Sequence, residues 1–272
     1  MKVDYHVNST ASIDCSEPME KSVRAAIAQG LDIICFTDHL DLIDGRMPGA
    51  TLPDGYALWQ RSYAQIAEVR EKYGDKVEIL HGMELAEIPQ DLPRAKEYAA
   101  IEGIDYLLGA THILPNHQDF YYLQFTDQAM CETLADLYLD ETYVLAQANL
   151  ADTIAHIGYL NRYMARQGFR VDLMQQGREE KLRAIFQTLI NNNRGIEVNT
   201  SGMRQEYGAS FPNLPMLQLY RSLGGEIITI GSDAHSAGHV GSNFTRAAAL
   251  LRTAGFTHFT IFRKRQPEFI KL

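Results

Sequence analysis

The stretch IICFTDH, residues 33–39, decides how this sequence is expected to fold. Its apolar residues run without interruption and then stop at an aspartate and a histidine. A short, continuous apolar run is typical of a strand buried on both faces, as in the parallel sheets of α/β proteins. The run IITIG at 227–231 repeats the pattern and is followed by SDAH at 232–235. Both stretches therefore predict a buried parallel strand that ends on titratable side chains.

Apolar runs of this kind recur along the chain and alternate with longer helical patterns. The predicted strands are Val3–Val7, Asp32–Thr37, Val77–Met83, Tyr106–Thr111, Thr153–His156, Gly195–Asn199, Glu226–Gly231 and a last one, His258–Phe262. The predicted helices include Pro18–Ala28, Ala57–Lys72, Asp127–Ala148 and Glu179–Asn191. Short links between alternating strands and helices imply right-handed βαβ units. Seven or eight such units in 272 residues favour a closed barrel. The alternative, an open doubly wound sheet, should carry a glycine-rich phosphate turn after its first strand, and the sequence has none there.

Composition bounds the kind of protein and its partners. Apolar residues make up 46% and charged residues 22% of the chain, which is the balance of a soluble globular protein. We expect a single domain over residues 1–272. The net charge of −9 argues against duplex nucleic acid as a partner, because neutralising phosphates needs a basic face.

The cysteines and the apolar runs indicate a compartment. Cys15, Cys35 and Cys131 form no paired spacing, so no disulfide framework is expected and a reducing compartment fits best. No apolar run is long enough to span a membrane, and the first residues contain no secretory signal pattern. We therefore expect a cytoplasmic protein. We also expect a monomer, because a small-molecule pocket can be complete within one chain.

Nearly every predicted strand ends on a histidine or a carboxylate. In chain order the polar residues at these ends are His6, Asn8 and Asp14, then Asp38 and His39, Glu84, His112, His156, Asn199 and Arg204, and finally Asp233 and His235. One histidine at a strand end is more often a hydrogen-bonded structural residue than a ligand. In a parallel barrel, however, all strand carboxyl ends open onto one face. Burying so many titratable groups together is costly, and divalent cations offset that cost because imidazole and carboxylate are their natural ligands.

Local spacing supports a metal centre at that face. His6 and Asn8 stand two residues apart in a strand, so their side chains point to the same side. Asp233 and His235 have the same spacing, and both pairs could chelate an ion. Glu84, at another strand end, could bridge two ions with its two oxygens.

These motifs resemble those of the polymerase-and-histidinol-phosphatase (PHP) superfamily. The resemblance rests on DYHVN at 4–8, FTDH at 36–39, GMELAE at 82–87, THI at 111–113, AHIG at 155–158 and GSDAH at 231–235. Their order and spacing match over nearly the whole chain. GYLNRY at 158–163 and EVNTSGMR at 197–204 look more like the histidinol-phosphate phosphatase branch. The resemblance implies a distorted (β/α)7 barrel, similar to a TIM barrel, that hydrolyses phosphate esters with two or three divalent ions.

The same resemblance implies three sets of ligands. One ion would take His6, the residue at position 8, Glu84 and Asp233; a second would share Glu84 and take His112 and His156; a third would take Asp14, His39 and His235. Zinc, manganese and iron all occur in the family, so the identity of the metal does not follow from the motifs.

Asn8 departs from the family pattern. The first family motif is His-x-His, and its second histidine is replaced here by Asn8. An amide oxygen is a weaker ligand than imidazole for zinc-like ions. Three interpretations are open: Asn8 ligates through its oxygen, the first ion is weakly held or absent, or the asparagine is an engineered substitution.

The implied mechanism uses a hydroxide shared by two ions, which attacks phosphorus in line. Arg162 and Arg204 would bind the other phosphoryl oxygens, since the guanidinium fork suits phosphate. For Arg162 the alternative is a solvated charge on a helix face. Asp38 would orient a ligand or shuttle a proton. The motifs assign no proton donor for the leaving group.

The substrate expected from the resemblance is a small phosphorylated metabolite, first of all histidinol phosphate in histidine biosynthesis. A second hypothesis is another phosphate mono- or diester, selected by loops 40–56 and 113–126 in the wall of the pocket. A third is a metal-binding domain with little turnover because of Asn8. Other histidines have simpler interpretations: His81 as a packed or supporting residue, His117 as an exposed loop residue, and His239 and His258 as structural residues.

Overall fold

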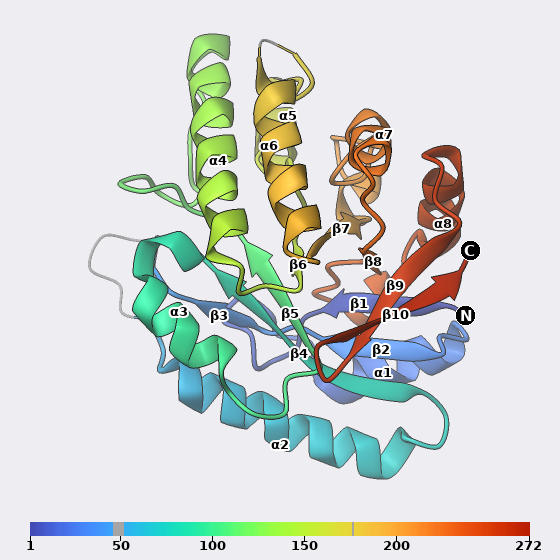
Figure 1. The fold of residues 1–272 in the computed structure, drawn as a ribbon. Helices are drawn as coiled ribbons and strands as arrows, with labels where there is room; N and C mark the ends of the chain where they lie inside the picture. Colours follow the sequence, from blue (N-terminus) through green and yellow to red (C-terminus); the bar gives the residue numbers. More distant parts are fainter. Residues whose placement is uncertain (46–51, 176) are drawn as a thin grey trace.

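A parallel β-barrel that nearly closes forms the centre of the computed structural model, which describes residues 1–45, 52–175 and 177–272 (Figure 1). Neighbouring strands follow the order β1-β2-β4-β5-β6-β7-β8. Their bounds are β1 Val3–Val7, β2 Ile33–Phe36, β4 Glu78–Ala86, β5 Tyr106–Ala110, β6 Thr153–Ile154, β7 Gly195–Asn199 and β8 Ile228–Gly231, and a short strand β3, His39–Asp41, pairs with β4. The barrel closes where Val7 pairs with Ala234 and the Asn8 amide donates to the Ala234 carbonyl over 2.9 Å. The predicted seven-stranded parallel barrel is confirmed.

Helices cover the outside of the barrel (Figure 1). They are α1 Met19–Ala28, α2 Gly55–Tyr73, α3 Leu92–Ala99, α4 Gln128–Ala148, α5 Asn161–Arg166, α6 Arg178–Asn191, α7 Leu214–Ser222 and α8 Phe244–Thr253, with 3-10 turns at Ile88–Asp91, Ser201–Arg204 and Ala237–His239. Val7, Ile34 and Phe36 pack outward with Val23 of α1 and Ile66 of α2. Residues that alternate with them along the strands therefore face the barrel interior. Among the described helices, none is long and apolar enough to cross a membrane.

The last predicted strand forms but does not join the barrel. β9, His258–Arg263, pairs antiparallel with β10, Gln266–Lys271, instead of extending the parallel sheet. The Tyr5 hydroxyl donates to the Phe262 carbonyl over 3.0 Å and accepts from the Phe262 amide over 3.1 Å. Two hydrogen bonds thus anchor the β9–β10 hairpin to β1 of the barrel.

Two strand ends differ from prediction for a local reason. Strand β6 stops at Ile154, two residues before the predicted end, because His156 has a backbone φ of 29° that a strand does not tolerate. Strand β4 instead runs on to Ala86, so that Glu84 lies inside a strand that β3 and β5 hold on both sides. Both deviations fall at residues that the sequence predicts as metal ligands.

Candidate metal centre

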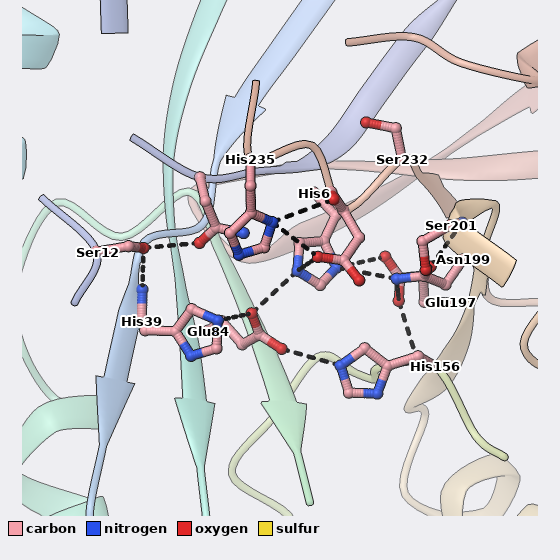
Figure 2. Close-up of polar contacts among 12 residues, drawn as sticks. His6, Ser12, His39, Glu84, His156, Glu197, Asn199, Ser201, Ser232 and His235 are labelled. Atoms are coloured by element: carbon pink, nitrogen blue, oxygen red, sulfur yellow. Dashed lines mark hydrogen bonds and ion pairs between the residues drawn. The ribbon is translucent and has the colours of Figure 1, made fainter. Parts of the chain in front are cut away.

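Glu84 lies at the centre of the site, and its side chain is 1% exposed. Its Oε2 lies 2.9 Å from His6 Nε2 and 3.2 Å from His39 Nε2. Its Oε1 lies 3.1 Å from His156 Nε2 and 3.4 Å from His112 Nε2. Figure 2 shows the carboxylate between the rings of His6, His39 and His156. Four imidazoles from four separate segments thus converge on one carboxylate, through the ring nitrogen that could bind a metal.

The group Glu84, His112 and His156 has the dimensions of a metal site. The two Nε2 atoms are 3.2 Å apart and lie 3.4 and 3.1 Å from Glu84 Oε1. A tetrahedral ion with bonds of about 2.0 Å would hold its ligand atoms about 3.3 Å apart. The three atoms therefore outline one face of such a tetrahedron. These residues fit a divalent ion without rearrangement.

A second group that could hold an ion comprises Asp14, His39 and His235, whose ligand atoms lie within 4.8 Å of one another. Asp14 Oδ2 is 3.1 Å from His235 Nε2 and 3.8 Å from His39 Nε2. The Asp14 side chain is 48% exposed, so this group lies at the solvent-facing rim. The structure thus brings together the residues that the sequence assigns to the third ion.

The residues predicted for the first ion lie at the seam between β1 and β8. His6 Nε2 is 3.9 Å from Asp233 Oδ1 and 2.9 Å from Glu84 Oε2. The side chain of Asn8 is fully buried, and its Oδ1 accepts from the Ser12 hydroxyl over 2.7 Å. Asp233 has a φ of 55°, a conformation that costs energy for this residue type and often marks functional sites. His6, Glu84 and Asp233 thus meet, with Asn8 on the same strand segment.

Two supporting carboxylates were missed by the sequence analysis. Glu197 Oε1 lies 2.8 Å from His6 Nδ1, and Asp41 Oδ1 lies 3.0 Å from His39 Nδ1. A carboxylate on the far nitrogen fixes the tautomer and leaves Nε2 free to bind a metal. Glu197 Oε2 also accepts the backbone amide of His156 over 3.0 Å. Glu197 stands two residues before Asn199 in a buried strand, so the two side chains point to the same side. A charged side chain on that side could have identified Glu197 as a residue of the site from the sequence.

The charges around Glu84 set the protonation of the metal-free imidazoles. Burial by itself would lower the pKa of His6 and His39, but the charges of Glu84 and the other carboxylates around them together outweigh it and hold both pKa values well above the ordinary one. For His112, burial is likewise outweighed by the hydrogen bond and charge of Glu84, which raise its pKa to about 9. In the metal-free protein these histidines are therefore protonated, and their positive charges balance the negative charge of Glu84.

Removal of the metal should make stability depend on alkaline pH. A histidine whose folded pKa is raised stabilises the fold fully below its unfolded pKa of about 6.5, and that contribution is lost as pH rises through the folded value. From pH 6.5 to 9 we expect the free energy of unfolding of chelator-stripped protein to fall by at least about 3 kcal/mol, the contribution of His112 alone. Urea denaturation at both pH values measures this. Metal-loaded protein is the control and should lose less, and a stripped protein equally stable at both would contradict the prediction.

Arg162 is buried in the site and is not a solvated charge on a helix face. Its Nη2 donates to Asp233 Oδ2 over 2.6 Å and to the Ser201 hydroxyl. Its guanidinium lies 4.8 Å from the centre of the Tyr159 ring, and its Nε has no hydrogen-bond partner among the described residues. A buried donor of this kind is available to an anion.

Arg204 lies in the pocket wall and also supports the backbone around Asp233. Its Nη1 donates to the Ser232 carbonyl over 2.7 Å and its Nη2 to the Asp233 carbonyl over 2.9 Å. These bonds hold the strained backbone of Asp233. The side chain lines the pocket, so it lies near any bound phosphate while two of its donors support Asp233.

Asp38 lies behind the metal ligands. Its carboxylate accepts from the Ser9 amide over 2.7 Å, from the Ser62 hydroxyl over 2.7 Å and from the Ser12 hydroxyl over 3.2 Å. It is not among the residues described as lining the pocket. His81 stacks on Trp59 with ring centres 3.8 Å apart and lies 3.0 Å from the Ser62 hydroxyl, in agreement with its interpretation as a packed residue.

A pocket of about 480 Å³ opens above the candidate ligands. Of the candidate ligands, Asp14, His39, His112, Asp233 and His235 line it. The rest of its lining includes three arginines, four tyrosines and three aspartates: Arg162, Arg166, Arg204, Tyr121, Tyr122, Tyr159, Tyr163, Asp41, Asp44 and Asp119. His239, interpreted as structural from the sequence, also lines it, because the turn after His235 bends back over the mouth. Loop 113–126 contributes to the wall as predicted. Part of loop 40–56, residues 46–51, lies outside the described residues.

The fold and the site together define a class: β/α-barrel hydrolases with a histidine–carboxylate metal centre at the carboxyl ends of their strands. Residues 4–201 match the model of the PHP domain, and the chain belongs to this family. It is 26% identical to a probable histidinol-phosphatase of Thermotoga maritima, over 97% of both chains. It is also 26% identical to the histidinol-phosphatase of Lactococcus lactis, over 96% of this chain and 94% of that one.

The fold is also close to that of a solved structure. The crystal structure of histidinol phosphate phosphatase from Lactococcus lactis, complexed with zinc, L-histidinol and phosphate, superposes with a TM-score of 0.81 at 24% identity, covering 98% of both chains. The likeness extends over the entire barrel.

Proposed function

We propose that this protein is a metal-dependent phosphomonoesterase that converts histidinol phosphate into histidinol and phosphate. The observation that carries this proposal is a single pocket whose lining includes His112 and His235, one from each of the two candidate metal groups, together with the buried guanidinium of Arg162. Metal ligands next to a buried cation suit a phosphate ester better than a neutral substrate. The relatives matched over their full length, named histidinol-phosphatases, support this substrate.

The side chains of the pocket would have separate roles in metal binding, phosphate binding and positioning. Bound divalent ions would supply a water of lowered pKa and neutralise charge on the phosphoryl group. Two or three such ions, with zinc, manganese or iron as candidates, would be held by the predicted ligands: His6, Asn8, Glu84, Asp233, His112, His156, Asp14, His39 and His235. Arg162 would take a phosphoryl oxygen with its unpaired donor, and Arg204 would keep Asp233 in position. Asp38 would act through Ser12 on the segment that carries His39.

The rest of the pocket suits the remainder of histidinol phosphate. That molecule carries an imidazole and an ammonium group in addition to its phosphate. Tyr121, Tyr159 and Tyr163 offer ring faces for the imidazole, and Asp119 and Asp41 offer negative charge for the ammonium. An anionic metabolite without a positive charge would lack a partner for these acids.

Phosphate release from a panel of esters tests the proposal. Metal-loaded protein should hydrolyse histidinol phosphate with a higher kcat/KM than phosphoserine, glycerol phosphate or a nucleoside monophosphate, and chelation should stop the reaction. If another ester of the panel is preferred, the substrate is wrong while the metal chemistry stands. If metal-loaded protein releases phosphate from none of them, the function itself is wrong.

Replacing Arg204 by alanine should lower kcat/KM by about 10- to 100-fold, because Asp233 loses the support of its backbone carbonyl. Steady-state kinetics together with metal analysis measures this. We expect the content of the first ion to fall as well, since Asp233 is one of its predicted ligands. Unchanged turnover, KM and metal content would remove Arg204 from the site.

A further inference from the structure

Only one orientation of the Asn8 side-chain amide suits the hydrogen-bonding groups around it. Its Oδ1 lies 2.7 Å from the Ser12 hydroxyl, and its Nδ2 is buried without a partner among the described residues. The same hydroxyl accepts the His39 amide over 2.9 Å and lies 3.2 Å from Asp38 Oδ1 (Figure 2 shows its contact with His39). Ser12 therefore faces two acceptor oxygens, one from Asn8 and one from Asp38.

Counting hydrogens decides between the two orientations of the amide. A serine hydroxyl has one hydrogen, so it cannot donate to Asn8 Oδ1 and to Asp38 Oδ1 at the same time. With the amide turned end for end, Nδ2 donates to Ser12, Ser12 donates to Asp38, and the buried nitrogen no longer lacks a partner. The two orientations occupy the same space, so hydrogen-bond partners decide between them. The turned orientation leaves the amide oxygen as the buried atom that needs a partner.

The strand geometry places that oxygen on the metal side. Asn8 and His6 flank Val7, which packs outward, so both side chains face the barrel interior. Val7 pairs with Ala234, the neighbour of Asp233. In the turned orientation the Asn8 oxygen is buried, unpaired and on the same face as His6, and the chain there is paired with the neighbour of Asp233, so this oxygen can bind a cation.

We propose that Asn8 binds the first ion through its Oδ1, locked in this orientation by Ser12 and Asp38, and that it makes this site selective for a harder ion. The set Asn8, Glu84, Asp233 and His6 offers three oxygens and one nitrogen, whereas the second site takes two imidazoles. Oxygen-rich sets suit manganese and magnesium, and imidazole suits zinc. The first site should therefore have a higher manganese-to-zinc affinity ratio than the second. This inference deepens the proposed function, but it concerns only the metal.

Metal binding tests the inference without any substrate. Chelator-stripped full-length protein is titrated with Mn²⁺ in the presence of one equivalent of Zn²⁺, bound Mn²⁺ is followed by electron paramagnetic resonance, and both metals are counted by elemental analysis. We expect at least one tightly bound Mn²⁺ per chain in the unmodified protein. Asn8→Ala should weaken its binding about 10- to 100-fold and leave the zinc in place. Asn8→His should lower the manganese-to-zinc ratio by at least about tenfold.

Further variants separate ligation from packing. Asn8→Asp has the same shape and keeps an oxygen for the ion but loses the amide hydrogen that is donated to Ser12, so it should retain more Mn²⁺ affinity than Asn8→Ala; an equal loss in the two variants would overturn the proposal. Ser12→Ala should weaken Mn²⁺ binding, whereas the matched Ser62→Ala, which removes another of the three hydroxyls on Asp38, should leave it unchanged. Equal effects of the two serine variants, or full Mn²⁺ affinity in Asn8→Ala, would also overturn it. Because no outcome depends on phosphate release, failure here is distinct from failure of the proposed function.

Discussion

A Glu84→Gln variant should fold, bind at least one metal ion fewer per chain and lose phosphatase activity by at least about 10³-fold. Glutamine keeps the shape of the side chain but removes the charge and one of the two acceptor oxygens. Both Glu84 oxygens are in use, one facing His6 and His39 and the other facing His112 and His156. If two ions share Glu84 as we propose, this substitution affects both sites together. Elemental analysis and kcat/KM for histidinol phosphate measure the effect.

Glu197→Gln is the matched control for this prediction. Glu197 is an equally buried carboxylate in the same site, but it contacts the far nitrogen of His6 and the amide of His156. Loss of a supporting carboxylate costs about 10- to 100-fold in metal affinity or activity. If Glu84→Gln were no more damaging than Glu197→Gln, Glu84 would not be shared between two ions.

The barrel was predictable because its signal is repeated. Several of the seven strands are short apolar runs, nearly all are followed by a histidine or a carboxylate, and a parallel barrel brings the carboxyl ends of all strands to one face. The convergence of His6, Glu84, His112 and His156 follows from that geometry. The antiparallel pairing of β9 did not, because the pattern of His258–Phe262 is the same for a barrel strand and for a hairpin strand.

The supporting residues were harder to predict because their role depends on depth and direction. Asp38 stands next to His39 in the sequence, yet successive side chains of an extended segment point to opposite sides, so Asp38 turns to Ser9, Ser12 and Ser62. Glu197 lies in the middle of a strand and looked like an interruption of an apolar run. His239 faces the pocket only because the chain after His235 turns back. The roles of Asp38, Glu197 and His239 all depend on tertiary contacts, which the spacing of residues along the sequence does not reveal.

Substituting lysine for Arg162 should reduce kcat/KM for histidinol phosphate by about 10²- to 10³-fold while the metal content changes little. Lysine keeps the positive charge beside Asp233, so charge alone cannot explain a loss. It gives up the planar fork, the contact with the Tyr159 ring and the buried Nε that has no partner within the described residues. The matched control is Arg166→Lys at the pocket mouth, whose side chain is 43% exposed and should matter less than about tenfold. Equal effects of the two substitutions would show that the pocket attracts phosphate by its summed charge. A loss of kcat/KM in Arg162→Lys alone means that recognition depends on a guanidinium donor that points at the phosphoryl group. Such a donor distinguishes a phosphoryl group from other anions, which positive charge alone does not.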